Sequence, residues 1–300
     1  MAQAFTLTFL IFDSFNGLVS AISKARLVNS HNSYVINSAM FFPIFKALNL
    51  DGFLELAYTP ANNWENRESR PMNIYALWSD GHSWSSEFQG VLKRGEIMRI
   101  TSSSLKPKML ETGICLLYPT IDELAPQMDL LPRAPYWFSN VPEWRCTSGL
   151  SNECAQTSYQ AEIYPLPSKA SMLTFHPFIQ FNKVDNYLLI LNITNEPTIT
   201  TNEIELFNST DLRKYGSASV RTNSASVIPL DVYGFTADDL PLFLSRKMAG
   251  IPFGLGVAKD GSMLSLEHTH PPASLVLFGN RNQIQSKIKK SWLQRIGEFK

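Results

Sequence analysis

The stretch Phe41-Phe-Pro-Ile-Phe-Lys-Ala-Leu-Asn-Leu-Asp-Gly-Phe-Leu-Glu-Leu56 decides the fold, because its pattern returns later in the chain. The counterparts lie 134 residues further on: Phe41, Pro43, Asp51, Phe53, Leu54 and Leu56 match Phe175, Pro177, Asp185, Tyr187, Leu188 and Ile190. Other blocks match at slightly different offsets: Ile97-Met98 and Ile100 with Val227-Ile228 and Leu230, Gly113-Ile114 with Gly250-Ile251, and Phe138 and Asn140 with Phe278 and Asn280. Such drift is typical of a duplicated domain, since loops absorb length changes and paired strands do not.

This repeat is too long for the unit of a solenoid, which spans roughly 20 to 50 residues. A chain of 300 residues has room for about two domains of ordinary size. We therefore predict two homologous domains in tandem. The expected division is copy one at 1–140, a proline-containing linker at 141–171, copy two at 172–283 and a C-terminal helix at 284–300.

Short β-type runs, rich in β-branched, leucine or aromatic residues, dominate both copies. They span 52–59, 72–78, 91–100 and 113–118, and then 186–194, 203–207, 218–230, 251–258, 263–268 and 274–278. Asp51-Gly52, Asp80-Gly81 and Asp260-Gly261 are turn signals between them. The pattern predicts an all-β protein in which each copy is an antiparallel β-sandwich, similar to immunoglobulin-like or jelly-roll-like sandwiches. This is a likeness of fold and carries no function.

An amphipathic helix is predicted at the C-terminus. Ile284, Ile288 and Trp292, with Leu293 and Ile296 beside them, fall on one face, and basic residues occupy the remainder. Such a helix either packs its apolar stripe on its own domain or lies on a membrane surface. No run approaches the length of about 18 apolar residues that a membrane-spanning helix needs, so we expect no transmembrane segment.

Charge excludes one class of partner. Lys plus Arg and Asp plus Glu both number 26, so no net positive field attracts a phosphate backbone, and nucleic acid is not expected as a partner. The apolar run that begins the chain lacks a basic n-region and ends at Asp13, which favours a strand over an intact signal peptide. A secreted protein whose signal had been removed would look the same, so the compartment of this soluble chain, cytoplasmic or secreted, stays open.

Cysteines and glycosylation sequons leave alternatives open. Cys146 and Cys154 would close a small loop in an oxidising compartment, whereas the other interpretation is three free thiols with Cys115 buried. Two sequons, Asn192-Ile-Thr194 and Asn208-Ser-Thr210, match the acceptor pattern for N-glycosylation.

The best candidate for chemistry is Glu267-His268-Thr269-His270. In a strand, His268 and His270 would project from the same face about 7 Å apart, a spacing at which two imidazoles can bind one divalent transition metal. A single imidazole with an oriented second nitrogen could instead act in acid–base catalysis, with Glu267 as the neighbouring carboxylate. The alternative is structural: both rings cap the end of a strand by hydrogen bonding to loops.

A candidate binding loop lies between the matched blocks of copy one. Trp64 stands in a polar segment with Arg67 and Arg70, a combination that is enriched in binding hot spots. The alternative is that Trp64 folds back over its own domain. The sequence thus favours a tandem β-sandwich module, binding or structural, that recognises a protein or small-molecule partner. The competing class is a metal-dependent or His-based enzyme centred on residues 267–270.

Overall fold

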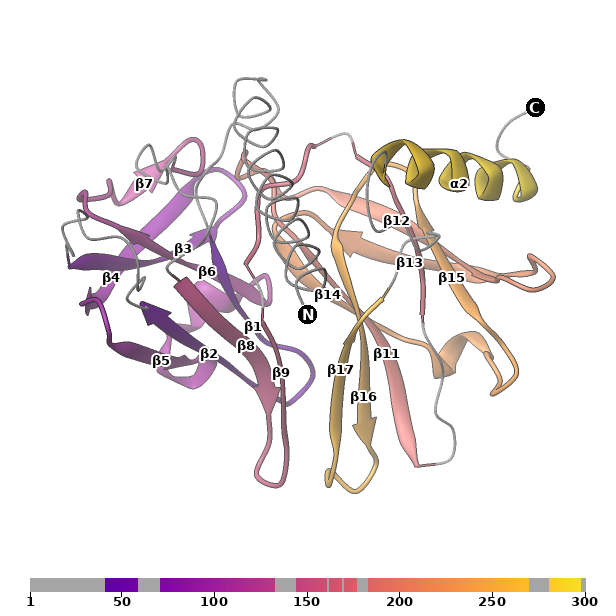
Figure 1. Ribbon diagram of the computed structural model, residues 1–300, viewed down its shortest axis with the longest axis horizontal. Helices are drawn as coiled ribbons and strands as arrows, with labels where there is room; N and C mark the ends of the chain where they lie inside the picture. Colours follow the sequence, from indigo (N-terminus) through magenta and orange to yellow (C-terminus); the bar gives the residue numbers. More distant parts are fainter. Residues whose placement is uncertain are drawn as a thin grey trace, which may run out of the picture.

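The computed structural model describes residues 41–58, 71–132, 144–160, 162–168, 170–176, 183–269 and 281–297. This part of the chain is mostly antiparallel β-structure arranged in four sheets, with a C-terminal helix (Figure 1). The all-β prediction is thereby confirmed. No helix among these residues is long and apolar enough to cross a membrane.

Two of the sheets form what we call the N-terminal sheet pair. Their orders are β1-β6-β3-β4-β7 and β5-β2-β8-β9. The strands are β1 (Phe42–Phe45), β2 (Asp51–Tyr58), β3 (Met72–Ser79), β4 (Trp84–Leu92), β5 (Ile97–Thr101), β6 (Ile114–Thr120), β7 (Gln127–Met128), β8 (Trp144–Ser151) and β9 (Gln156–Tyr159). Two short 3-10 helices, η1 (Ser102–Ser104) and η2 (Pro107–Leu110), connect β5 to β6.

The other two sheets form the C-terminal sheet pair, with orders β10-β15-β12-β13 and β14-β11-β16-β17. The elements are β10 (Met172–Phe175), β11 (Val184–Asn192), β12 (Thr201–Asn208), β13 (Lys214–Arg221), β14 (Ser224–Pro229), η3 (Asp231–Tyr233), β15 (Pro241–Ser245), β16 (Ile251–Ala258), β17 (Leu264–His268) and α2 (Arg281–Arg295). Apart from the short edge strand β7, this strand order is the same as that of the N-terminal pair, counted from β10 instead of β1.

The pairing registers show whether residues matched in the sequence occupy equivalent positions in the two sheet pairs. Leu54 pairs with Ile100 and Ser148, and Leu188 pairs with Ile228 and Gly254. Ile100 therefore occupies the position of Ile228, two residues from the Leu230 that the sequence match predicts.

The glycine match is wrong as a structural equivalence. Ile114 begins β6, which lies between β1 and β3, whereas Ile251 begins β16, which lies between β11 and β17. These strands occupy different positions in their sheets. Gly113-Ile114 and Gly250-Ile251 resemble each other because a glycine followed by an apolar residue commonly starts a strand, and not because they correspond.

Some inner strands supply two different hydrophobic clusters. In β11, Leu188 and Ile190 lie inside the C-terminal pair, whereas Leu189 and Leu191 lie in a central cluster between the two pairs. Strand β6 behaves in the same way, which is why all seven of its residues are buried. Successive side chains of a strand point to opposite faces, so both faces of these sheets are covered.

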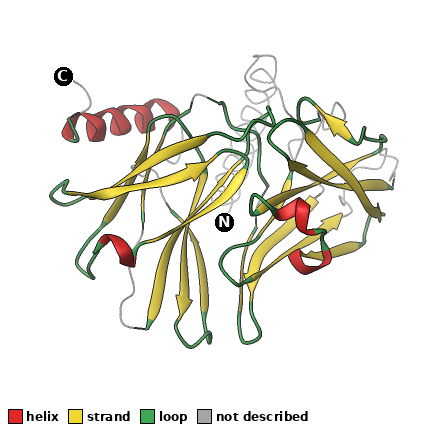
Figure 2. Cartoon of the chain, turned by 180° about the vertical axis from the view of Figure 1, so that it is seen from behind, coloured by secondary structure: helices red, strands yellow, loops and turns green. Residues whose placement is uncertain are grey.

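Hydrogen bonds reinforce the central cluster between the sheet pairs. The indole Nε1 of Trp84 donates to the carbonyl of Asn195 at 2.8 Å, and the amide of Leu131 donates to the same carbonyl at 3.1 Å. The amide of Ala225 donates to the carbonyl of Thr112 at 2.9 Å. Apolar burial and these bonds together join the two pairs side by side (Figure 2).

The segment expected as a linker, 141–171, differs from the expectation because it contains two strands. β8 pairs with β2 from Asp51 opposite Ser151 to Tyr58 opposite Trp144, and β9 pairs with β8. A Cβ at Gly149 would lie 2.1 Å from the carbonyl oxygen of Thr157, so glycine permits the close approach of β9. Small and polar residues give β8 a weak hydrophobic pattern, so the sequence pattern did not predict it as a strand.

The helix α2 packs the C-terminal part of its apolar stripe on the C-terminal sheet pair. Trp292, Leu293 and Ile296 contact a cluster on the outer sheet, and the Trp292 ring meets Phe175 edge to face at 5.0 Å between centroids. Figure 1 shows α2 lying across this end of the molecule. These three residues of the stripe are therefore packed against the chain's own sheet.

Candidate functional site

A largely apolar cavity of about 520 Å³ opens where the two sheet pairs and α2 meet. Its walls come from β9, β10, the first residues of β16, the last residue of β17, and α2. The apolar part is formed by Ile163, Met172, Leu173, Leu191, Ala249, Ile251, Pro252 and Phe253. The polar part is formed by Tyr159, Glu162, Ser171, Thr174, His268, Thr269, Ser286 and Lys289.

His268 lies at this cavity because of the period of its strand. Leu264 and Leu266 belong to the central cluster, and His268 follows them on the same face of β17. Its ring contacts Tyr159 and Phe253, with centroid separations of 5.3 and 5.0 Å. Two aromatic rings from different elements thus hold the imidazole in place.

The tautomer of His268 follows from one hydrogen bond. Nδ1 lies 2.9 Å from the carbonyl oxygen of Thr269. A carbonyl oxygen only accepts, so Nδ1 carries the proton and donates, and Nε2 of the neutral ring keeps its lone pair. This is the arrangement expected of an oriented imidazole, with a carbonyl in the place of a carboxylate.

The other members of the predicted constellation are not brought to the cavity. Glu267 is exposed and, as the neighbour of His268 in a strand, points to the opposite face. His270 lies outside the described residues. Within the described ranges, no group of three or more His, Cys, Asp or Glu side chains is placed to hold a metal ion, so the metal site stays a prediction.

Two further histidines are described, and neither joins His268. His82 is exposed in the turn after β3. His176 is buried, and its Nε2 would lie 2.6 Å from a Cβ at Gly254. Phe253 and Gly254 face opposite sides of β16, so the strand separates His176 from the ring of His268.

Lys289 is the cavity residue that sequence reasoning missed. The sequence pattern assigns the basic residues of the C-terminal helix to the faces outside its apolar stripe, but Nζ of Lys289 donates to the carbonyl of Ser171 at 3.1 Å and to its hydroxyl at 2.6 Å. Partial burial lowers the pKa of this ammonium. Its position three residues before Trp292, at the edge of the apolar stripe, is the sequence signal that was available.

The predicted binding loop with Trp64, Arg67 and Arg70 lies outside the described residues. Its role in recognition stays a prediction.

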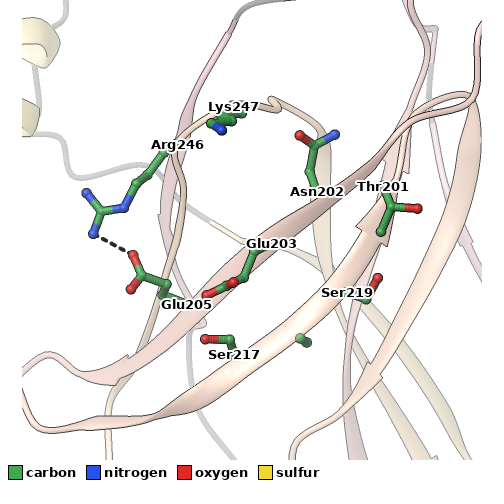
Figure 3. A pocket seen from close by; sticks show the side chains of 9 residues that line it. Thr201, Asn202, Glu203, Glu205, Ser217, Ser219, Arg246 and Lys247 are labelled. Atoms are coloured by element: carbon green, nitrogen blue, oxygen red, sulfur yellow. Dashed lines mark ion pairs between the residues drawn. The ribbon is translucent and has the colours of Figure 1, made fainter.

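A second cavity, of about 650 Å³, lies on the outer face of β12, β13 and the segment after β15 (Figure 3). Its lining is polar, with Glu203, Glu205, Arg246 and Lys247 among the residues that surround it. Burial alone would raise the pKa of Glu205, but ion pairs with Lys214 and Arg246 outweigh burial and hold the pKa below its usual value. The carboxylate is therefore already neutralised within the protein.

Pairing and burial describe the cysteines and the asparagines of the two sequons. All three cysteines are free; Cys115 and Cys146 are buried and Cys154 is exposed. Burial raises the pKa of the Cys115 thiol to about 12, so it is not a nucleophile at neutral pH. Asn192 and Asn208 of the two sequons are also buried, and their side chains donate to Ala249 and Asp239.

Comparison of the chain with protein-family models, curated proteins and solved structures finds no match.

Proposed function

We propose that this chain is a binding module, built from two related β-sandwich domains in tandem, that holds a small and largely apolar molecule in the cavity beside His268. The single observation that carries the proposal is that cavity, at the meeting point of both sheet pairs and α2. It is mainly apolar and has a few polar groups along its wall, which is the composition of small-molecule sites.

The tandem arrangement is supported by the strand orders. β1-β6-β3-β4 corresponds to β10-β15-β12-β13, and β5-β2-β8-β9 corresponds to β14-β11-β16-β17. The strands β2 and β11, which carry the strongest sequence match, occupy the same position in this scheme. An immunoglobulin-like or jelly-roll-like sandwich in each half is the form of this proposal, and duplication is its simplest origin.

The cavity is preferred over the polar cavity on β12 and β13 for an energetic reason. Removing apolar ligand surface from water contributes about 25 cal/mol per Å², whereas polar groups that already bond to each other must first be separated. At about 520 Å³ the apolar cavity also falls within the size range of sites for small molecules.

Filling the cavity tests the proposal. Ala249 lines it, so Ala249→Trp is expected to weaken binding of the uncharged fluorophore 1-aminoanthracene at least tenfold. Ala125 is exposed and outside the cavity, so Ala125→Trp is the matched control and should bind as the wild type does. Absence of binding by the wild type, or equal affinity in Ala249→Trp, would refute the proposal.

A protein partner is the other form of a binding function. It rests on Trp64 with Arg67 and Arg70, and Trp64→Ala is expected to reduce affinity for an identified partner by about 2 kcal/mol. Unchanged affinity would exclude this loop from the interface.

The competing proposal is a His-based or metal-dependent enzyme around Glu267, His268, Thr269 and His270. The observation in its favour is that the Thr269 carbonyl orients Nδ1 of His268, leaving Nε2 to take a proton. In ester hydrolysis, water would attack the carbonyl carbon as Nε2 takes its proton; the acyl C–O bond would then break as Nε2–H returns that proton to the oxygen of the leaving alcohol.

Turnover of p-nitrophenyl esters and metal content distinguish this enzyme from a binding module. Loss of turnover in His268→Ala but not in the exposed control His82→Ala supports the enzyme. One equivalent of transition metal in the purified protein, lost in His268→Ala, supports the metal-dependent form. Equal turnover in both variants and no bound metal would overturn it.

A further inference from the structure

We infer that the ligand of the cavity beside His268 is amphipathic, with an anionic head group such as a carboxylate bound by Lys289 and an apolar body in the cavity. This inference rests on the proposed binding function and assigns the chemical class of its ligand.

Lys289 reaches the cavity from α2 with donor capacity to spare. An ammonium group carries three N–H donors. Two of them go to the carbonyl and the hydroxyl of Ser171, on the strand side of the same cavity. Among the described residues Lys289 forms no ion pair with a carboxylate, so one donor and the full positive charge remain for a ligand.

The charge of Lys289 is costly where it lies. The side chain is only partly exposed, and its surroundings lower its pKa through desolvation, with no acidic neighbour contributing. Glu162, the one acidic residue of the cavity lining, is exposed and does not pair with Lys289. A half-buried charge without an anionic partner favours any anion that can approach it, so a ligand anion would be stabilised by the site more than a neutral group would.

The remaining lining suits the body of such a molecule. Met172, Leu173, Ile251 and Phe253 present carbon surface. Tyr159 and His268 close the side formed by β9 and β17. A hydrocarbon chain or ring would gain from leaving water here, while its head group stays at the Lys289 and Ser171 side. A medium-chain carboxylate has both properties.

Lys289 has one competing role, which is to fasten α2 to Ser171, the residue that precedes β10. In that role the side chain would contribute to stability and not to ligand choice. The two roles differ in a measurable way, because only a ligand contact makes affinity depend on the charge of the ligand.

The experiment compares decanoate with decanol as competitors of 1-aminoanthracene. Wild-type protein is expected to bind decanoate about tenfold more tightly than decanol, and added salt should reduce this preference. Lys289→Gln should lose the preference while its affinity for decanol is unchanged, and Lys289→Arg should retain it. Lys290→Gln, an exposed neighbour on α2, is the matched control and should behave as the wild type does.

Three other outcomes would contradict the inference or the binding function on which it rests. If the wild type binds neither the fluorophore nor the competitors, the binding function itself fails. If decanoate and decanol bind equally well in the wild type, the cavity binds ligands but the role of Lys289 is refuted. If Lys289→Gln loses both ligands together with thermal stability, Lys289 serves as an anchor of α2 and the inference is overturned.

Discussion

Leu188 and Leu189 are neighbours on β11, and both are 0% exposed although they face opposite sides of the sheet. Leu188 lies inside the C-terminal sheet pair, whereas Leu189 lies in the central cluster and pairs in register with Phe253. In a sandwich with a solvated outer face, only one of two adjacent residues would be buried. Here both faces are covered, so Leu188→Ala and Leu189→Ala are each expected to cost about 3 kcal/mol, within the usual range for buried leucines.

Equilibrium urea unfolding, followed by far-UV circular dichroism, measures both costs. Ile97 is 70% exposed, so Ile97→Ala is the control, with an expected change below about 0.5 kcal/mol. The wild type should unfold in a single transition, since the central cluster couples the two pairs. If Leu189→Ala lowered the free energy of unfolding no more than Ile97→Ala does, the outer face of β11 would be solvated and the central cluster would be refuted.

Three further predictions concern backbone strain, thiol reactivity and charge. Gly113 and Gly95 both have positive φ, at +78° and +91°. A Cβ at Gly113 would lie 3.1 Å from the backbone of β14, whereas a Cβ at Gly95 would have no atom within 4 Å. Gly113→Ala should therefore lower the melting temperature clearly more than Gly95→Ala does. A thiol reagent should label Cys154 quickly and the buried thiols only on unfolding, because burial raises the pKa of Cys115 to about 12; three fast thiols would contradict this. The ion pairs of Glu205 hold its pKa below the ordinary 4.5, so the stability that this carboxylate contributes is present above pH 4.5 and is lost as the pH falls through the lowered pKa. Glu205→Gln should therefore be about 1 kcal/mol less stable than the wild type at neutral pH and equal to it in acid. The same difference in stability at both pH values would refute the role of the ion pairs.

Local pattern was enough to predict most strands. The expected run 251–258 coincides with β16, and 203–207 lies within β12, where Ile204 is buried and Glu203 exposed. The run 91–100 was predicted as one strand but contains the end of β4, a turn at Gly95 and the start of β5. A hairpin with a short turn between two apolar ends is easily mistaken for one strand in the sequence, because the apolar residues on both sides suggest a continuous run.

The sequence by itself determined the all-β class, the offset that relates β2 to β11, and the apolar stripe of α2, because each depends on residues close together in the chain. Only the tertiary structure decided that β8 and β9 complete a sheet with β2, that Lys289 reaches Ser171, and that the cavity exists. The pairing of β8 with β2 and the contact of Lys289 with Ser171 join residues roughly a hundred positions apart. No local spacing encodes them, because the small and polar residues of β8 and β9 give only a weak strand pattern, and the helical spacing that places Lys289 beside the apolar stripe does not specify its partner.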